Sequence, residues 1–126
     1  MSMRDALAVA AAAASIGAGT GAHAAGDPAA GQAIFKQQCT ACHSVDAGKE
    51  GAGPSLHRVV GRRAGSEPGF SYTPAIKASR VTWAPATLDT FLSGPAKMIP
   101  GTAMPITLAD SKQRHDVIAY LASQKK

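Results

Sequence analysis

The chain has 126 residues, of which 45% are hydrophobic and 17% charged, and its formal net charge is +5. This length suits one domain, and these fractions are ordinary for a globular protein. No run of about 18 strongly apolar side chains is present, which excludes an evident membrane span. Two cysteines are too few for a disulfide-dense scaffold or a four-cysteine zinc site.

Residues 1–24 have the features of a targeting segment that is removed after export. Arg4 makes the first part weakly basic, residues 6–16 form an alanine-rich apolar stretch, and the A-H-A triplet ending at Ala24 fits the A-x-A cleavage rule. We therefore expect a signal peptide at 1–24, a mature domain at 25–126 and a periplasmic location. Two alternatives stay open, which are an alanine-rich disordered arm and an uncleaved membrane anchor.

The mature part is poor in the residues that build an apolar core. Leu, Ile, Val and Phe contribute 18 of its 102 residues, which is below the roughly 20% that, together with a high net charge, warns of disorder. Because the sequence nevertheless predicts helices, a group other than these side chains must provide part of the apolar core. A large buried cofactor would do so.

Both ends of the mature part are predicted to be helical. Asp27 is suited to cap a helix and Pro28 to occupy its first position, so we expect a short amphipathic helix over about 28–40. Near the other end, Asp110 resembles the first residue of a capping box, and an apolar stripe carries a second helix to about residue 123.

Between these helices the sequence is rich in residues that break regular structure. Glycines and prolines predict a long loop over 46–71 and another from Pro95 onward, with short helical turns at about 74–79 and 86–93. Strand-like alternation of useful length and internal repeats are both missing from the sequence. Long loops in a small domain make sense if they wrap a cofactor. The predicted fold class is therefore all-α, with few helices and many loops.

Cys39, Cys42 and His43 form a C-x-x-C-H motif, the attachment site of c-type haem. Two cysteines three apart on a helical turn project to the same side, so both thiols can add to the two vinyl groups of one porphyrin. The histidine can then bind the iron as its proximal ligand. A thioredoxin-type redox pair would need a βα junction, which the sequence does not indicate, and a chance match is a further alternative.

A haem iron bound by one histidine needs a second axial ligand or has an open site. From residue 25 onward only Met98 and Met104 carry a thioether, which is a ligand that stabilises Fe(II) and raises the reduction potential. Met104 lies in a stiff, proline-flanked stretch able to hold its side chain, whereas Met98 is more typical of an apolar packing residue. His57 is a weaker alternative ligand.

These motifs, in this order, make the chain resemble a class I cytochrome c of the mitochondrial or soluble bacterial type. The resemblance covers nearly all of 27–126, and the matching stretches are 31–35, 53–57, 61–63, 68–73, 82–83, 99–104 and 116–121. It implies a small fold in which the first and last helices cross, with Gly31 and Tyr120 at their contact, while the loops wrap one covalent haem c.

The resemblance also implies roles for individual residues. Pro54 would accept a hydrogen bond from His43 and so orient the ring. Donors beside the haem propionates would offset the cost of burying two carboxylates. Thr102 would join the hydrogen-bond network of the loop that presents Met104, which the resemblance favours as axial ligand. The predicted cofactor-binding residues are Cys39, Cys42, His43, Pro54, Arg62, Tyr72, Trp83, Thr102 and Met104, with His43 and Met104 as the iron ligands and with Arg62, Tyr72 and Trp83 on the propionates.

Two positions depart from the family pattern. Phe91 stands where many members have a tyrosine bonded to the axial sulfur, and Ile76 replaces an asparagine that helps to hold a buried water. Both changes remove polar groups from beside the haem, which disfavours the charged ferric centre. The loop between His43 and Pro54 is also one residue shorter than in mitochondrial relatives.

With both axial positions filled, the iron would have no open site, so we expect a single-electron carrier of the periplasm and not an enzyme. The resemblance implies a quinol–cytochrome c reductase (cytochrome bc1-type) as donor and a terminal oxidase or photosynthetic reaction centre as acceptor. The basic charge suits transient docking of a monomer on acidic faces of such membrane complexes, and nothing indicates nucleic-acid binding.

Two other functions remain open from the sequence. If Phe91 leaves the bond to Met104 labile, the protein would be a weak peroxidase or a gas-binding haem protein. If the N-terminus is not cleaved, the protein would be an anchored subunit of a larger complex.

Overall fold

The structure is a computed structural model that describes residues 26–124, so the predicted signal peptide lies outside the described residues. Within residues 26–124 the chain forms five helices, which are α1 (Pro28–Gln38), α2 (Pro74–Ala78), α3 (Pro85–Ser93), α4 (Pro95–Met98) and α5 (Ser111–Ser123). This part of the chain has no strand, and its only β pairing is two isolated bridges, His43 with Glu50 and Arg63 with Thr82. The predicted all-α, loop-rich fold is confirmed.

Helix α1 begins as predicted but ends two residues early. Asp27 caps it, because its side chain accepts a hydrogen bond from the Ala29 N–H at 2.9 Å. At the other end, the N–H groups of Cys39 and Thr40 both donate to the carbonyl of Phe35, at 2.9 and 3.1 Å. The Thr40 hydroxyl occupies the carbonyl of Lys36 instead, at 2.7 Å. The side chain of Thr40 thus competes with its own backbone and closes the helix at residue 38.

Helix α5 is capped by Asp110, whose carboxylate accepts from the Gln113 N–H at 2.9 Å. Arg114 joins this helix to α3, because its Nε donates to Asp89 at 2.8 Å and its Nη1 to the carbonyl of Leu108 at 2.9 Å. These contacts fix the chain that enters α5 against the middle of the molecule.

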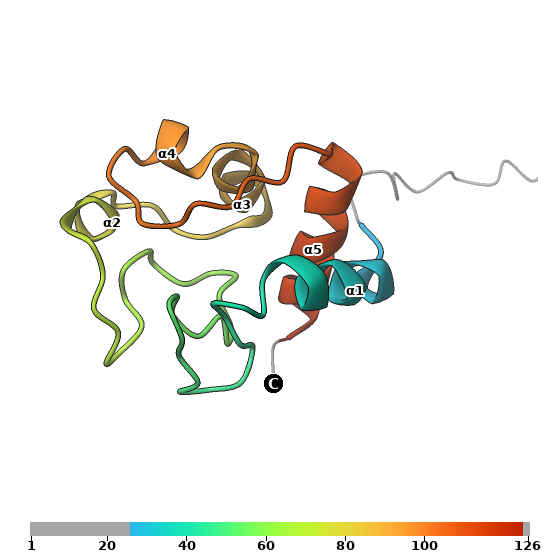
Figure 1. Cartoon of the computed structure of the whole chain (residues 1–126), viewed down its shortest axis with the longest axis horizontal. Coiled ribbons are helices and arrows are strands. Elements are labelled where there is room, and N and C mark those ends of the chain that lie inside the picture. The colour runs from blue at the N-terminus through green and yellow to red at the C-terminus, as the bar shows by residue number, and fades with distance from the viewer. Residues whose placement is uncertain (1–25, 125–126) are drawn as a thin grey trace, which may run out of the picture.

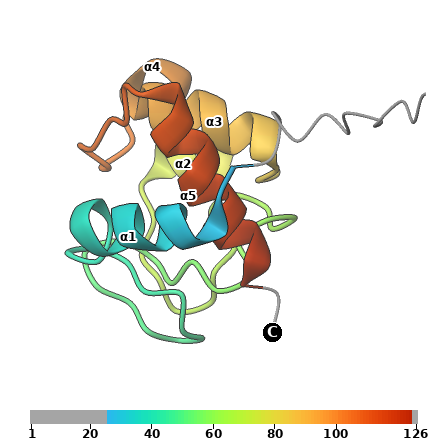
Figure 2. The same ribbon diagram turned by 90° about the vertical axis from the view of Figure 1, so that its right-hand side faces the viewer.

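Helices α1 and α5 cross in close contact, as the two ribbon views show (Figures 1 and 2). Gly31 lies at the crossing, where an added Cβ would collide with the backbone carbonyl of Asp116 and lie 2.9 Å from the Cβ of Tyr120. The rings of Phe35 and Tyr120 meet beside it, with centroids 5.4 Å apart. The predicted crossing at Gly31 and Tyr120 is therefore confirmed.

The middle of the chain contains one helix that the sequence does not predict. The sequence predicts that Pro95 opens a loop, but Pro95 occupies the first position of the single-turn helix α4, where proline is well tolerated. The carbonyl of Gly94 holds this turn by accepting from the N–H groups of Lys97 and Met98, at 3.1 and 3.0 Å. Helices α2 and α3 lie within one residue of their predicted bounds. None of the helices in residues 26–124 has the length and apolar character that a membrane crossing requires.

Candidate haem site

A cavity of about 250 Å³ lies at the centre of the fold, between the helices and the long loops. Most of its wall is apolar. Side chains of α1, α2, α3 and α5 line it together with the loops, and the most buried of them are Val117, Val59, Phe35, Leu121 and Leu88. The loops of residues 39–73 and 102–106 therefore close over an apolar chamber, whose walls are partly built from the buried core of the fold.

Cys39 and Cys42 lie on one wall of this cavity, directly after α1. The N–H groups of Cys42 and His43 both donate to the carbonyl of Cys39, at 3.1 and 2.9 Å, so the C-x-x-C-H segment continues the helix as a tight turn. Both thiols are free, half-buried and part of the cavity wall. Burial, helped by the nearby Cys42, raises the pKa of the Cys39 thiol to about 11, so this group is protonated at neutral pH.

His43 is held in one tautomer by the loop that follows it. Its Nδ1 lies 2.7 Å from the carbonyl oxygen of Pro54, which can only accept, so Nδ1 carries the proton and the Nε2 lone pair is available. A Cβ at Gly53 would collide with the imidazole, so glycine is what allows the ring to lie against this loop. Burial lowers the pKa of His43, the Pro54 hydrogen bond opposes this, and the charge of Arg62 lowers it further. The net result favours the neutral ring that binds a metal.

Met104 lies on the wall of the same cavity, and the two alternative ligands do not. The Met104 N–H donates to the Thr102 hydroxyl at 3.4 Å, and the backbone N–H of Thr102 donates to the carbonyl of Ile99 at 3.1 Å. Met98 ends α4 and packs against the outside of the core. His57 also lies away from the cavity, with its Nδ1 3.2 Å from the carbonyl of Val45.

Arg62, Tyr72 and Trp83 come together on another part of the wall. The Arg62 Nε is buried and has no hydrogen-bond partner within the described residues. Burial raises the pKa of Tyr72, so its hydroxyl remains a donor. Trp83 is 8% exposed, lines the same wall and carries one N–H donor on its indole ring. Donors of this kind in an apolar cavity call for an acceptor, and an ionised carboxylate is the strongest one.

Glu67 is a contact of this site that the sequence analysis missed. Its carboxylate accepts from the Arg62 Nη1 at 2.7 Å, and its N–H donates to the Tyr72 hydroxyl at 3.1 Å. Residues five apart in an irregular loop follow no helical or strand period, so no sequence pattern indicates this pair. Phe91 and Ile76, the two departures from the family pattern, also line the cavity.

These residues fit an iron porphyrin. Two thiols, a neutral imidazole, a thioether and an unpaired buried N–H surround one apolar cavity, and each matches a different part of such a cofactor. Together with the crossed terminal helices, they define a protein of the c-type haem class.

Comparison with known proteins gives the family. The family model for cytochrome c matches residues 28–125. A cytochrome c2 from Rhodomicrobium vannielii is 50% identical over 105 residues, which is 82% of this chain and 83% of that protein. A cytochrome c from Tetrahymena pyriformis is 46% identical over 78% of this chain and 89% of its own length. Among solved structures, cytochrome cH from Methylobacterium extorquens superposes with a TM-score of 0.72 at 42% identity, over 78% of this chain and 99% of that chain.

The chain therefore belongs to the cytochrome c family. It binds one covalent haem c and is an electron-transfer protein that exchanges electrons with redox partners, not an enzyme. The family resemblance, the cofactor and the class of function expected from the sequence are confirmed.

Proposed function

We propose that this protein is a soluble, monomeric single-electron carrier of the bacterial periplasm, with its haem iron bound by His43 and Met104. It would shuttle electrons from a quinol–cytochrome c reductase to a terminal oxidase or a photosynthetic reaction centre. The observation that carries this proposal is the presence of the His43 imidazole and the Met104 thioether on the wall of one cavity, while Met98 and His57 lie outside it.

Different residues of the chain would bind different parts of the cofactor. Cys39 and Cys42 would attach it by adding their S–H groups across its two vinyl groups, so that each sulfur bonds one carbon and each proton goes to the other. Pro54 keeps the His43 ring in the tautomer that presents Nε2. Arg62, Tyr72 and Trp83 would donate to the propionates. When bound, the haem supplies a one-electron Fe(III)/Fe(II) couple.

Thr102 and its neighbours place the Met104 side chain. Gly101 has a φ of 92°, in the left-handed region that favours glycine, and an added Cβ there would lie 3.0 Å from the Cβ of Ala75 in α2. The loop is thus fixed against α2 at one point and by the Thr102 hydrogen bonds at another. These contacts limit the movement of the loop that would present Met104 to the iron.

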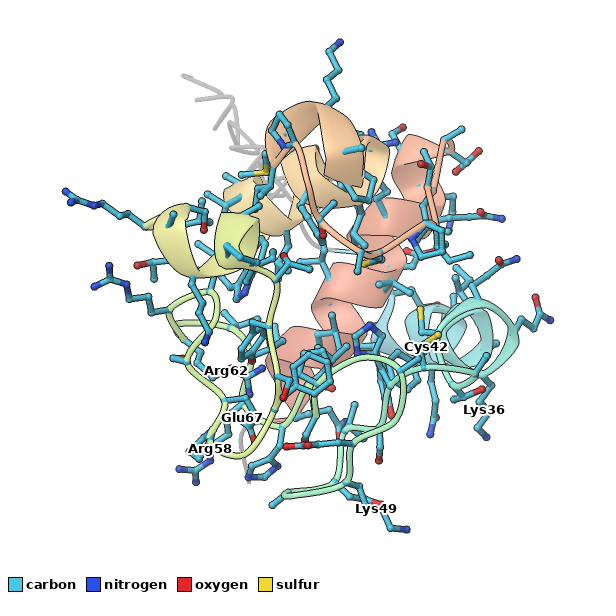
Figure 3. The ribbon with its side chains drawn as sticks, turned by 60° about the vertical axis from the view of Figure 1, so that its left-hand side comes forward. Lys36, Cys42, Lys49, Arg58, Arg62 and Glu67 are labelled. Carbon is cyan, nitrogen blue, oxygen red and sulfur yellow. The ribbon has the colours of Figure 1, made fainter. Side chains whose placement is uncertain are left out.

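Charge supports a partner with an acidic docking face. The chain carries 13 basic and 8 acidic residues. Lys36 and Lys49 are exposed and project outward from the segments before and after Cys42 (Figure 3). A basic surface near the attachment site would raise the rate of encounter with an acidic partner, and small interfaces of this type dissociate readily.

An optical spectrum of the purified ferric protein at neutral pH tests the ligand assignment. A weak long-wavelength band from Fe(III) bound to methionine sulfur is expected. If the band were missing while the haem stayed covalent, the electron-carrier proposal with a closed iron would fail. The peroxidase or gas-binding alternative, for which Phe91 is the structural basis, would then be tested with peroxide and carbon monoxide.

The proposed processing has its own test. Fractionation of the cells, followed by mass spectrometry of the purified protein, is expected to find a soluble periplasmic species that begins at Ala25. A membrane-bound species that retains residues 1–24 would overturn the periplasmic assignment and favour an anchored subunit.

A further inference from the structure

Both terminal nitrogens of the Arg62 guanidinium donate hydrogen bonds to the protein. Nη1 donates to the Glu67 carboxylate at 2.7 Å and to the carbonyl of His57 at 2.9 Å, and Nη2 donates to the carbonyl of Ser55 at 2.8 Å. Only Nε, which is buried, has no partner among the described residues. Figure 3 shows Arg62 beside Glu67 in the loop, and Arg62 is also part of the cavity wall, so the same side chain contacts a carboxylate and borders the space for the haem.

Glu67 is fixed in this position by its own backbone. Its N–H donates to the hydroxyl of Tyr72, another residue of the cavity wall, at 3.1 Å. The side chains of Glu67 and Arg62 are only 15% and 16% exposed, so their ion pair is largely shielded from water. Shielding strengthens the interaction of a charge with its surroundings, and it also makes burying that charge costly. The Glu67 carboxylate is buried at this cost and contacts Arg62. Its negative charge therefore changes the electrostatic potential that Arg62 exerts on its other neighbours.

We propose that Glu67 is a positioning residue that sets the electrostatics of the haem site through Arg62 and thereby lowers the reduction potential. The guanidinium shares one positive charge among its three nitrogens, and the Glu67 carboxylate offsets part of that charge from the outer side. Less positive potential then reaches the cavity. Because Fe(III) carries one more positive charge than Fe(II), the carboxylate favours the oxidised state. This inference rests on the proposed function, in which Arg62 donates to a propionate.

Two substitutions in the holoprotein separate charge from structure. Glu67→Gln keeps the length of the side chain and an oxygen that can accept from Nη1, but it removes the charge. Glu67→Asp keeps the charge. At a fixed applied potential near the midpoint, the ratio of reduced to oxidised haem is expected to rise roughly threefold in Glu67→Gln. On the scale where tenfold corresponds to 59 mV for one electron, that is a rise of about 28 mV. In Glu67→Asp the ratio is expected to stay near that of the wild type.

Asp46→Asn is the matched control, because it removes the same charge from an exposed carboxylate that lies 3.7 Å from Lys49. Its effect on the ratio is expected to be smaller than that of Glu67→Gln. The proposal is overturned if Glu67→Gln leaves the ratio unchanged, if Asp46→Asn shifts it as much, or if Glu67→Asp shifts it as far as Glu67→Gln.

The long-wavelength methionine band, recorded in the same samples, keeps this test apart from that of the proposed function. If the wild type lacks the band, the assignment of Met104 fails. The comparison of variants still decides the role of Glu67, because all of them then share the same ligation. If only Glu67→Gln loses the band, its ratio reports a changed ligand, and the assignment of Glu67 as an electrostatic residue is overturned.

Discussion

At the scale of single residues, the position of the Met104 sulfur is set by the backbone of its loop and not by polar partners of the sulfur. Within residues 26–124 no hydrogen bond reaches the Met104 side chain, and its backbone is held through Thr102. Phe91, buried and with its ring centroid 4.9 Å from that of Trp83, offers no hydroxyl. Ile76 is equally apolar. The strength of the proposed iron–sulfur bond therefore depends on how well residues 99–105 keep the methionine in place.

Met104→Ala tests this assignment. The haem is expected to stay covalently attached while the reduction potential falls, because the soft ligand that stabilises Fe(II) is gone. Imidazole should bind the iron at least about tenfold more tightly, since Met104 no longer competes for the position. Optical titration with imidazole measures this.

Met98→Ala is the control for that experiment, because Met98 lies outside the cavity wall. It is expected to leave both the potential and the imidazole affinity unchanged. Should Met98→Ala open the iron while Met104→Ala does not, the loop assignment would be wrong.

At the scale of elements, the crossing of α1 and α5 is where the two ends of the described chain hold each other. Val117 is 1% exposed, and Gly31 allows the backbones to approach. Asp116 adds a polar anchor, because its carboxylate accepts from the Asp27 N–H at 2.8 Å and from Lys112 at 2.7 Å. Contacts of Gly31 and Asp116, which lie outside the cavity wall, thus help to position the two helices that border it.

Gly31→Ala tests the close approach. Alanine favours a helix over glycine by about 1 kcal/mol. At this crossing, however, the added methyl collides with the Asp116 carbonyl, so a net loss of about 2 kcal/mol in the free energy of unfolding is expected. Gln32→Ala, one residue along on the exposed face, should change it by less than about 0.5 kcal/mol. Denaturation by guanidinium chloride measures the free energy of unfolding of both variants. If Gly31→Ala were as stable as the wild type, the close approach of α1 and α5 at Gly31 would be contradicted.

Asp116 makes stability depend on pH in a defined direction. The hydrogen bond from Lys112, followed by that from the Asp27 N–H, lowers the pKa of this carboxyl. A group whose pKa is lower in the folded state stabilises the protein above its unfolded pKa of about 3.9, and that contribution disappears as the pH falls through the folded value.

Asp116→Asn should therefore reduce the free energy of unfolding at neutral pH by about 1–2 kcal/mol and flatten its fall below about pH 4. Thermal denaturation followed across pH 2–7 checks both effects. Asp46→Asn, at a carboxylate whose side chain is 67% exposed, is expected to change neutral-pH stability by less than about 0.5 kcal/mol. A difference between Asp116→Asn and wild type that persisted unchanged at low pH would contradict the assignment.

At the scale of the whole molecule, a net charge of +5 surrounds a single redox centre. Charges of one sign attract oppositely charged partners over distances set by the ionic strength. The attraction belongs to the whole surface and not to one ion pair, since basic residues are spread over α1, α2, α4, α5 and the loops.

This charge predicts a salt dependence of electron transfer. The second-order rate constant for reduction by an anionic small-molecule reductant should fall about tenfold between low ionic strength and about 0.5 M. A neutral reductant of similar driving force is the control and should show almost no change. A rate that rose with salt for the anionic reagent would mean that the reacting face of the protein is acidic. Stopped-flow spectrophotometry provides the measurement.

The features that can be predicted from the sequence are those that depend on a few neighbouring residues. The C-x-x-C-H segment specified a c-type haem, Asp27 with Pro28 and Asp110 specified where two helices begin, and the glycines and prolines specified loops over 46–71. Each of these signals acts through local backbone geometry or covalent chemistry. Such features can be predicted from the sequence without knowledge of the fold.

Which residues share the cavity, and what surrounds each of them, depends on the three-dimensional path of the chain. Met104 and Met98 are both thioethers near prolines, and only the path of the chain places one of them on the cavity wall. Helix α1 ends early because the Thr40 hydroxyl occupies a backbone carbonyl, and Glu67 meets Arg62 across an irregular loop. Contacts of this kind follow no sequence period, because they depend on how loops fold in three dimensions around an apolar centre.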